Sequence, residues 1–398
     1  MRTAVDHRVS AVLGVLTICA YGSWHYAFGV LLDPIRLDTG WRESTLAASF
    51  STGVVLVGVG SLAGGRLLDA VGPRRVFLIA GVVGGGALAA ASFADSAVLF
   101  LLASAVGLGV TGSLGFYHVT MATTVRLHPT APAKAIAVLT IWGALASAIY
   151  LPITAWLVDS LGWRGTVRIL AASSSAAFLL AVLALPKPPA SEVVERPSLR
   201  AVVRLAVAPG SPILLAIAIS CGGVAMSTLL VYQVPIMTSL GLPAATAATF
   251  AGVRGFAQLG GRLPLGRLID RFGVDASLVT AFVAIGCGGA VLAVANDRPT
   301  AAVFALVAGF GIGAFSPLQG IKAQELFDDH ALGATMGFYS SLMMLAGSVG
   351  PAVAGGFAES TGDRRWASAV VVVAAGGAAL AVLKMRLVAP AHRQDQRP

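Results

Sequence analysis

The chain has 398 residues, of which 57% are hydrophobic and only 11% are charged. Soluble globular proteins carry about 25% charged residues, so this composition indicates a membrane protein. This composition excludes a secreted enzyme, a disordered regulator and a nucleic-acid binder. The net charge of +9 does not indicate nucleic-acid binding, because it is typical of the basic cytoplasmic loops of a membrane protein.

Twelve apolar stretches, separated by short polar breaks, follow one another along the chain. The first six predicted spans cover residues 10–33, 45–66, 76–94, 98–122, 134–158 and 165–185. The second six cover residues 212–237, 244–264, 276–295, 300–323, 332–358 and 366–386. Each stretch has about the 20 residues that a membrane helix needs. The sequence therefore predicts an all-α membrane protein with twelve transmembrane helices.

The one sizeable hydrophilic break, residues 187–210, separates the two sets of spans. It is rich in proline and charged residues, which is typical of a linker. We therefore expect an N-terminal six-helix bundle over residues 1–186 and a C-terminal one over 211–398. Between them we expect a cytoplasmic linker with a short surface helix at residues 198–207.

The two sets of spans repeat each other. The segment Gly65–Asp69 recurs as Gly266–Asp270, 201 positions later. The segment Asp159–Arg164 recurs, at an offset of 200, as Glu359–Arg364. Parallel repeats of six helices, related by a pseudo-twofold axis, are typical of one large class of transporters that hold their substrate between the halves.

The basic residues predict the orientation. If both termini are cytoplasmic, 18 of the 27 Lys and Arg side chains lie in cytoplasmic segments and 7 lie outside. This bias follows the rule that cytoplasmic loops are the positive ones. Together with the high Ala and Gly content, it predicts a multi-pass protein of the bacterial inner membrane.

One loop carries a family resemblance. The pattern Gly65-x-Leu67-x-Asp69-x-x-Gly72-x-Arg74-Arg75 resembles the signature loop of the major facilitator superfamily. The chain also resembles the monocarboxylate-porter branch of that superfamily, in the segments Phe28-Gly29-Val30, Gly40-Trp41, Leu161-Gly162-Trp163-Arg164, Gly241-Leu242 and Gly261-Arg262-Leu263. The resemblance covers the whole chain and implies the major facilitator fold, with a monomer as the default state.

The resemblance also implies a conformational latch at the cytoplasmic side. Its members in this sequence are Gly65, Asp69, Gly72, Arg74, Arg75, Gly266, Asp270 and Gly273. Glycines permit close helix approach and tight turns, and Asp69 can face a helix N-terminus or an arginine. The alternative is that Arg74 and Arg75 only set the topology.

Arg254 is the most informative candidate for a substrate ligand. It lies near the middle of the span 244–264, where an arginine costs roughly 2.5–3.5 kcal/mol and needs a partner or a wet cavity. No Asp or Glu lies deep in any predicted span, and the matching residue in the first half is Gly53. The sequence therefore predicts that Arg254 binds an anion from outside the chain.

Arg254, Gln258 and Arg262 are spaced four residues apart and so share one helix face. Arg262 aligns with an arginine that binds the substrate carboxylate in the resembled family. The alternative for Arg262 is that its side chain reaches the cytoplasmic interface.

Other polar residues within the spans complete the predicted site. Proton-coupling candidates are His25, His118 and Asp33, because a histidine titrates near neutral pH. The animal members of the branch carry a lysine where this chain has His25-Tyr26, and an aspartate where it has Gln258. The further substrate-binding candidates are His25, Tyr26, Tyr117, Tyr232, Gln233 and Tyr339.

Several motifs indicate no chemistry. Gly107-x-Gly109-x-x-Gly112 spells a dinucleotide fingerprint, but it falls inside a predicted span, as does Gly309-x-Gly311-x-Gly313. Such glycines favour close helix packing. The sequence has no phosphate-binding GK[ST] loop, no HExxH, no paired cysteines and no GxSxG. We therefore expect no enzyme activity, no catalytic residue, no metal and no cofactor.

The sequence thus predicts a secondary active transporter of a small organic anion, a monocarboxylate coupled to protons. Its partners would be the anion, the proton and the lipid bilayer, without nucleic acid. One alternative is an exporter of drug-like or amphipathic compounds, with a cavity lined by Trp24, Trp142 and Phe310. Another is a non-transporting membrane sensor. The sequence does not indicate the particular substrate, the direction or the stoichiometry.

Overall fold

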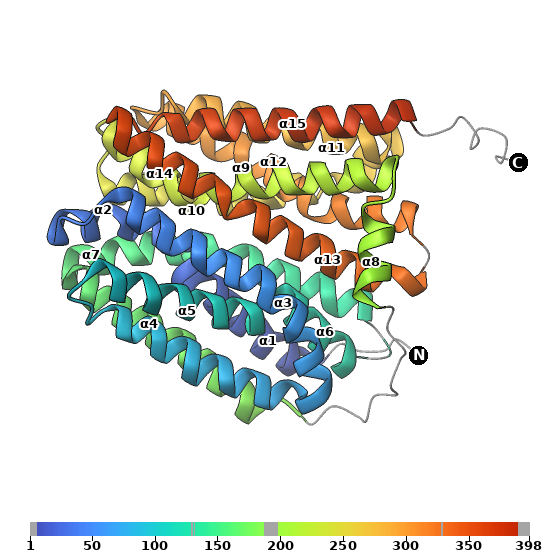
Figure 1. Ribbon diagram of the computed structural model, residues 1–398, viewed down its shortest axis with the longest axis horizontal. Helices are drawn as coiled ribbons and strands as arrows, with labels where there is room; N and C mark the ends of the chain where they lie inside the picture. The colour runs from blue at the N-terminus through green and yellow to red at the C-terminus, as the bar shows by residue number, and fades with distance from the viewer. Residues whose placement is uncertain (1–5, 129, 131, 187–197, 328, 389–398) are drawn as a thin grey trace, which may run out of the picture.

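The computed structural model describes residues 6–128, 130, 132–186, 198–327 and 329–388, and these are almost entirely helical. The helices run side by side along the long axis of the molecule (Figure 1). In the first part of the chain they are α1 (His7–Ala20), η1 (Tyr21–Tyr26), α2 (Phe28–Thr39), α3 (Glu43–Ile79), η2 (Ala80–Gly84), α4 (Gly85–Ala91), α5 (Ala97–Gly115), α6 (Tyr117–Leu127) and α7 (Pro132–Ala184). Here η1 and η2 are π-helical turns.

The second part of the chain continues the bundle. Its helices are α8 (Leu199–Ala206), α9 (Ser211–Ser239), α10 (Ala244–Arg262), α11 (Leu265–Leu292), α12 (Arg298–Leu326), α13 (Asp329–Gly347), α14 (Val349–Thr361) and α15 (Trp366–Val388). Helices of the two parts pack on each other: α2 contacts α9, α3 contacts α13 and α14, and α7 contacts α10. Every predicted span coincides with a helix or with consecutive helices.

Among the described residues, ten helical segments are long and apolar enough to cross a membrane. One of them, Val138–Ala184, has 47 residues, or about 70 Å of helix against a hydrocarbon core of about 30 Å. It bends at Gly162, whose φ is 66°. The 19-residue α10 is outside the ten, because Arg254, Gln258 and Arg262 lower its hydropathy.

Glycines with positive φ mark the bends, and they recur along the chain. Gly72 and Gly273 have nearly identical angles, φ 78° and 79° with ψ 166° in both. Gly40 and Gly241 end the helices before the next span, both again with positive φ. Side chains with a Cβ rarely adopt this conformation. The sequence repeat is thus accompanied by a repeat in the backbone.

The predicted surface helix is confirmed as α8, which lies across one end of the bundle (Figure 1). Residues 187–197 of the predicted linker lie outside the described residues. Tyr339 of α13, which is predicted to bind substrate, lies beside α8. Its hydroxyl donates to the carbonyl oxygens of Ala206 and Pro212, each at an O···O distance of 3.1 Å. In this conformation the phenol joins α8 to the start of α9, and its role in substrate binding stays a prediction.

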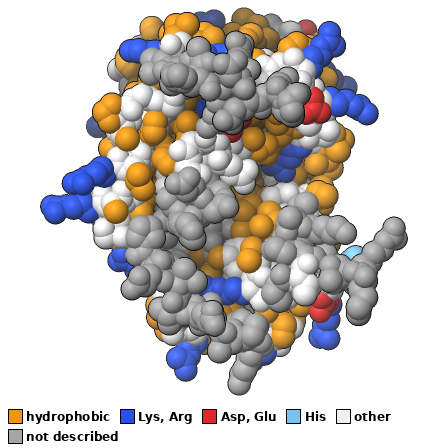
Figure 2. Space-filling view, turned by 90° about the vertical axis from the view of Figure 1, so that its right-hand side faces the viewer, with side chains coloured by type: hydrophobic (Ala, Val, Ile, Leu, Met, Phe, Trp, Pro, Cys, Tyr) orange, Lys and Arg blue, Asp and Glu red, His pale blue; other side chains and the backbone are white. Residues whose placement is uncertain are grey.

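The end of the bundle that carries α8 also holds the beginning of α1 and the end of α15 (Figure 1). Seen from that end, Lys and Arg side chains are more prominent around the rim than Asp and Glu (Figure 2). This is the end predicted to be cytoplasmic, and we call the opposite end the predicted extracellular end.

The glycine motifs serve helix packing, as expected. A methyl group added to Gly107 or Gly109 would meet the side chains of Leu88 or Leu56 at 2.6 Å. On α12, a Cβ at Gly309 would lie 2.5 Å from the carbonyl oxygen of Arg254, and one at Gly313 would lie 2.0 Å from that of Gln258. The glycine face of α12 therefore lets the backbone of α10 approach closely.

Candidate functional site

Arg254 lies inside the protein, with 3% of its surface exposed. Its Nε donates a hydrogen bond of 2.8 Å to Oε1 of Gln233, on α9. Its Nη2 and the Nε2 of Gln233 are buried, and neither has a hydrogen-bond partner among the described residues. In this part of the chain no ion pair involves Arg254. Two buried NH₂ groups, one of them charged, are therefore available to an acceptor that the described residues do not supply.

Arg262, two turns further along α10, is half-buried and contacts the first part of the chain. Its Nη1 donates to the carbonyl oxygen of Thr140 on α7 at 3.1 Å. Its Nε is buried without a described partner. Gln258, between the two arginines, is 5% exposed. The predicted row of polar residues therefore faces the protein interior, and its inner end links α10 to α7.

Aromatic side chains of the first part of the chain face this row. Tyr26 interacts electrostatically with both Arg254 and Arg262, and Tyr117 interacts electrostatically with Arg262. Tyr21 stacks on Phe116 with ring centroids 3.8 Å apart. These residues belong to the π-helical turn η1 and to the break at Phe116 between α5 and α6. Irregular turns of this kind occur frequently at functional sites.

His25 lies in the same π-helical turn, enclosed by rings. Its ring is 5.6 Å from Phe50 and 5.4 Å from Phe116, measured between centroids. It is 8% exposed, and its Nδ1 has no partner in the described part of the chain. His118 differs, because its Nε2 is 2.7 Å from the carbonyl oxygen of Ser113. Among the described residues, His25 therefore has a buried ring nitrogen without a partner, while one ring nitrogen of His118 is held by a backbone carbonyl.

Two predicted site residues lie away from Arg254, at the predicted extracellular end. Asp33 is bound by Arg364, which precedes α15, with Nη1 to Oδ2 at 2.8 Å and a second contact between Nη2 and Oδ1. The phenol of Tyr232 interacts electrostatically with Glu43, Arg364 and Asp33. The structure therefore separates Asp33 and Tyr232 from the central group of Arg254, Gln233 and Tyr26.

These contacts belong to a cluster that we call the outer ion-pair cluster: Asp33, Arg36, Arg42, Glu43, Glu359 and Arg364. Arg364 also donates to Oε2 of Glu43, from Nε at 3.1 Å and from Nη2 at 2.9 Å. Arg42 pairs with Glu359. Both bridges join the first part of the chain to the second, and the residues around them line a polar cavity of about 1050 Å³.

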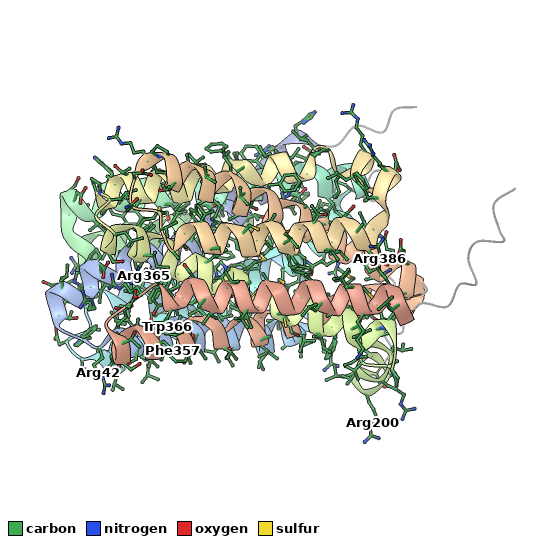
Figure 3. The ribbon with its side chains drawn as sticks, turned by 90° about the horizontal axis from the view of Figure 1, so that it is seen from above. Arg42, Arg200, Phe357, Arg365, Trp366 and Arg386 are labelled. Atoms are coloured by element: carbon green, nitrogen blue, oxygen red, sulfur yellow. The ribbon has the colours of Figure 1, made fainter. Side chains whose placement is uncertain are left out.

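Arg364 remains charged in this cluster. Burial lowers its pKa, but hydrogen bonds and attraction to Asp33 and Glu43 raise the pKa well above its ordinary value. Figure 3 shows Arg42 and Arg365 at this end of the molecule, with Arg200 and Arg386 at the other. The ion pairs of the outer cluster thus hold α2 and α3 against α14 and the start of α15 at this end of the long axis.

The predicted latch is described in part. Gly72 and Gly273 make the expected tight turns. Arg74 donates to the carbonyl oxygen of Leu185, at the end of α7, while Arg75 and Asp270 are exposed. At Gly266 an added methyl group would meet no atom within 4 Å, so that glycine does not serve close packing here.

The side chain of Asp69 lies outside the described residues, and the described contacts do not test the role of Gly65. The structure therefore confirms the turns of the signature loop and leaves the latch itself a prediction.

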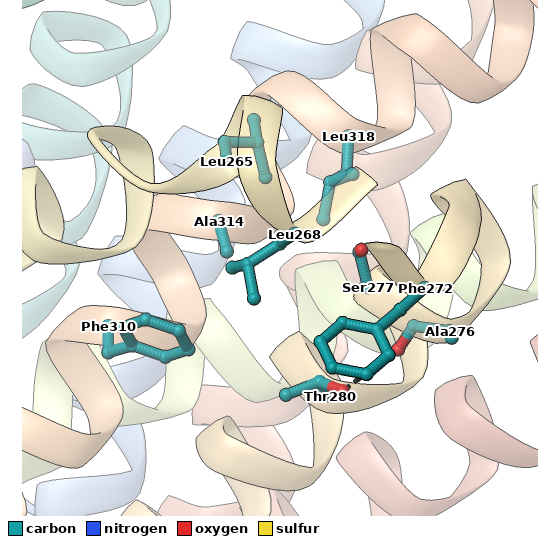
Figure 4. Close-up of a pocket in the computed structure, with 9 residues that line it drawn as sticks. All are labelled: Leu265, Leu268, Phe272, Ala276, Ser277, Thr280, Phe310, Ala314 and Leu318. Carbon is teal, nitrogen blue, oxygen red and sulfur yellow. Dashed lines mark hydrogen bonds between the residues drawn. The ribbon is translucent and has the colours of Figure 1, made fainter. Parts of the chain in front are cut away.

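The aromatic residues of the alternative exporter site contact different neighbours. Trp24 packs on Phe28 and Phe100 in the core, and Trp142 lies against Gly14. Phe310 lines an apolar pocket of about 290 Å³ between α11 and α12, with Leu268, Phe272 and Thr280 around it (Figure 4). The exporter alternative stays a prediction.

Sequence reasoning missed Phe50, Phe116 and the carbonyl of Thr140 at the central site, and Glu43 and Arg364 in the outer cluster. Arg364 had a signal, because it aligns with Arg164 in the repeat. Arg164 donates to the carbonyls of Ser92 and Ala94 within its own half. The two arginines therefore share a position in the repeat but have different partners.

The comparisons with known proteins agree with this architecture. The sequence profile of the Major Facilitator Superfamily matches residues 13–253 and 213–398. Monocarboxylate transporter 13 of Rattus norvegicus is 26% identical over 342 residues, which are 85% of this chain and 79% of that protein.

Solved structures share the fold at low sequence identity. A mutant of the nucleoside transporter NupG superposes with a TM-score of 0.78 and 16% identity, covering 97% of this chain and all of that one. A D-xylose-proton symporter gives 0.74 and 13%, covering 97% and 98%. These similarities establish the fold of the chain alone.

Proposed function

The chain belongs to the major facilitator superfamily, and from this premise we propose that it is a secondary active transporter of a small organic anion. We assign the anion to the monocarboxylates and the coupling ion to the proton. The observation that carries the proposal is Arg254, a buried guanidinium with an unpaired Nη2 and, among the described residues, no carboxylate beside it. The similarity to a monocarboxylate transporter supports the same class of substrate.

We place the protein in a bacterial inner membrane with both termini cytoplasmic. It would cross the bilayer twelve times, since the bend at Gly162 divides one long helix and α10 adds a crossing of low hydropathy. The crossings would form two six-helix bundles, residues 1–186 and 211–398, related by a pseudo-twofold axis. We expect a monomer.

The proposed mechanism follows from the charge. An unpaired guanidinium in a low-dielectric site is costly, and an anion that pairs with it lowers that cost. The anion would accept hydrogen bonds from Nη2 of Arg254 and Nε2 of Gln233. With the charge neutralised, the two halves can rock around the occupied site, as in other transporters built from repeats. Tyr26 and Tyr117 would form the opposite wall.

The test is uptake of labelled lactate, pyruvate and related acids into proteoliposomes. We expect Arg254→Gln to reduce uptake at least tenfold, because a charge-assisted hydrogen bond is lost. Arg200→Gln, on the exposed α8, is the matched control and should transport normally. Unchanged uptake by a folded Arg254→Gln protein would refute the proposed mechanism.

A further inference from the structure

The outer ion-pair cluster contains one carboxylate that is only half-satisfied. The side chain of Glu43 is 10% exposed. Its Oε2 accepts two hydrogen bonds from Arg364, but its Oε1 is buried and has no hydrogen-bond partner among the described residues. A buried carboxylate oxygen without a donor is costly, and protonation removes that cost.

Asp33, the other carboxylate on Arg364, is bound differently. Arg364 contacts both of its oxygens, and Thr238 also lies within 3.4 Å of Oδ2. Nε of Arg36 is 3.6 Å from Oδ1. Both oxygens of Asp33 are therefore engaged, while one oxygen of Glu43 has no donor among the described residues.

Several charged or titratable groups face Glu43 from the packed elements. They are Asp33 and Arg36 from α2, Tyr232 from α9, Glu359 from α14, Arg42 before α3, and Arg364 before α15. Arg42 is engaged by Glu359. Without Arg364, Glu43 would face Asp33 and the Tyr232 phenol, and a second anion beside Asp33 favours protonation.

We propose that Glu43 is the proton-binding group of the transport cycle, loaded from outside when the outer ion-pair cluster is apart. This inference rests on the proposed function. Separated from Arg364, the Glu43 carboxylate takes one proton from external water. When Arg364 docks again, the O–H bond of Glu43 breaks and water in the protein accepts the proton. In the proposed cycle, the proton then passes the Tyr232 hydroxyl toward the central site.

The geometry also links this group to the anion site. Tyr232 and Gln233 are consecutive residues of α9. The phenol of Tyr232 interacts electrostatically with Glu43, and Oε1 of Gln233 accepts a hydrogen bond from Arg254. A small rotation or shift of α9 therefore changes both environments together. Proton binding at Glu43 and anion binding at Arg254 act on one helix, which is what coupling requires.

The test compares two assays on the same proteoliposomes. In Glu43→Gln the amide can still accept from Arg364, so the gate still closes, but no proton is carried. We expect anion exchange at equal pH to stay within about twofold of wild type, and accumulation driven by a proton gradient to fall at least tenfold. Asp159→Asn, an exposed carboxylate at the position of the first half that corresponds to Glu359, is the matched control and should retain both activities. Proton-driven accumulation by Glu43→Gln at the wild-type level overturns the proposal.

A second variant covers the case in which Glu43→Gln does not fold. Glu43→Asp keeps the acid but withdraws it from Arg364 by one methylene. A shift of at least 0.5 pH units in the midpoint of proton-driven accumulation supports the proposal, and an unchanged midpoint overturns it. If the wild-type protein exchanges no organic acid at all, the proposed function fails, and that result is distinct from either outcome for Glu43.

Discussion

At the scale of single residues, the partner of Arg254 matters as much as the arginine. Gln233 is neutral, so it orients the guanidinium through Nε without neutralising it. A carboxylate at this position would make a fixed ion pair. The neutral amide therefore keeps the positive charge available to a substrate.

Gln233→Glu tests this directly. The new carboxylate would compete with the anion for Arg254, so we expect the KM for the transported acid to rise at least tenfold, or about 1.4 kcal/mol. Initial rates of uptake over a range of acid concentrations measure it. Gln319→Glu, on α12, is the control and should leave KM within about twofold. An unchanged KM for Gln233→Glu would show that Gln233 does not set the charge of the site.

The residues of the central site were predictable to different degrees. Arg254 and Arg262 were identifiable because a charge inside an apolar span is rare and costly. The contact of Arg262 with the carbonyl of Thr140 was not, because a backbone acceptor leaves no mark in the sequence. The contacts of Tyr339 were not predictable, because a tyrosine in a span looks the same in the sequence whether it faces a substrate or a helix end.

At the scale of helices, the spacing between α10 and α12 positions the two arginines. Gly309 and Gly313 allow the backbone carbonyls of Arg254 and Gln258 to lie against α12. Such small-residue contacts are the usual means by which membrane helices approach closely.

Gly313→Ala should therefore separate these helices. Its Cβ would lie 2.0 Å from the carbonyl oxygen of Gln258, and overpacking of this kind costs about 1–3 kcal/mol. We expect a lower melting temperature of the purified protein and a loss of anion affinity. Gly356→Ala, where an added methyl group meets nothing within 4 Å, is the control and should be neutral or slightly stabilising. Equal melting temperatures for the two variants would contradict this account of the α10–α12 contact.

The helices themselves were largely predictable, and their irregularities were not. Apolar length placed all twelve predicted spans on helices, and glycine spacing anticipated the turns at Gly72 and Gly273. The π-helical turn η1 and the break at Phe116 depend on how rings from different helices pack together. That information is tertiary, so no pattern within one span reveals it.

At the scale of the whole molecule, the outer ion-pair cluster defines the state of the protein. Its ion pairs join the two parts of the chain. Arg364 of the second part pairs with Asp33 and Glu43 of the first, and Arg42 of the first part pairs with Glu359 of the second. We interpret this arrangement as the conformation closed at the predicted extracellular end.

Reversing one charge should open that end. In Glu359→Arg, two arginines would face each other, so we expect a longer distance between spin labels at Leu37→Cys and Thr361→Cys. The distances are measured by pulsed electron paramagnetic resonance. The native cysteines Cys19, Cys221 and Cys287 are replaced first, so that only the two introduced cysteines carry spin labels. The double variant Arg42→Glu/Glu359→Arg restores the pair and should restore the shorter distance. If Glu359→Arg leaves the distance distribution unchanged, this bridge does not hold the two parts together.

The π-helical turn at Tyr21–Tyr26 has a mechanical consequence. The hydrogen bonds of such a turn span one residue more than those of an α-helix. The position of the extra residue would move along the helix if these hydrogen bonds were exchanged for α-helical ones, one at a time. As it moves, the rings of Tyr21, His25 and Tyr26 would turn about the helix axis while both helix ends stay in place. In the proposed transporter, the helix that contains this turn would thereby change its contacts with a bound anion without shifting through the membrane.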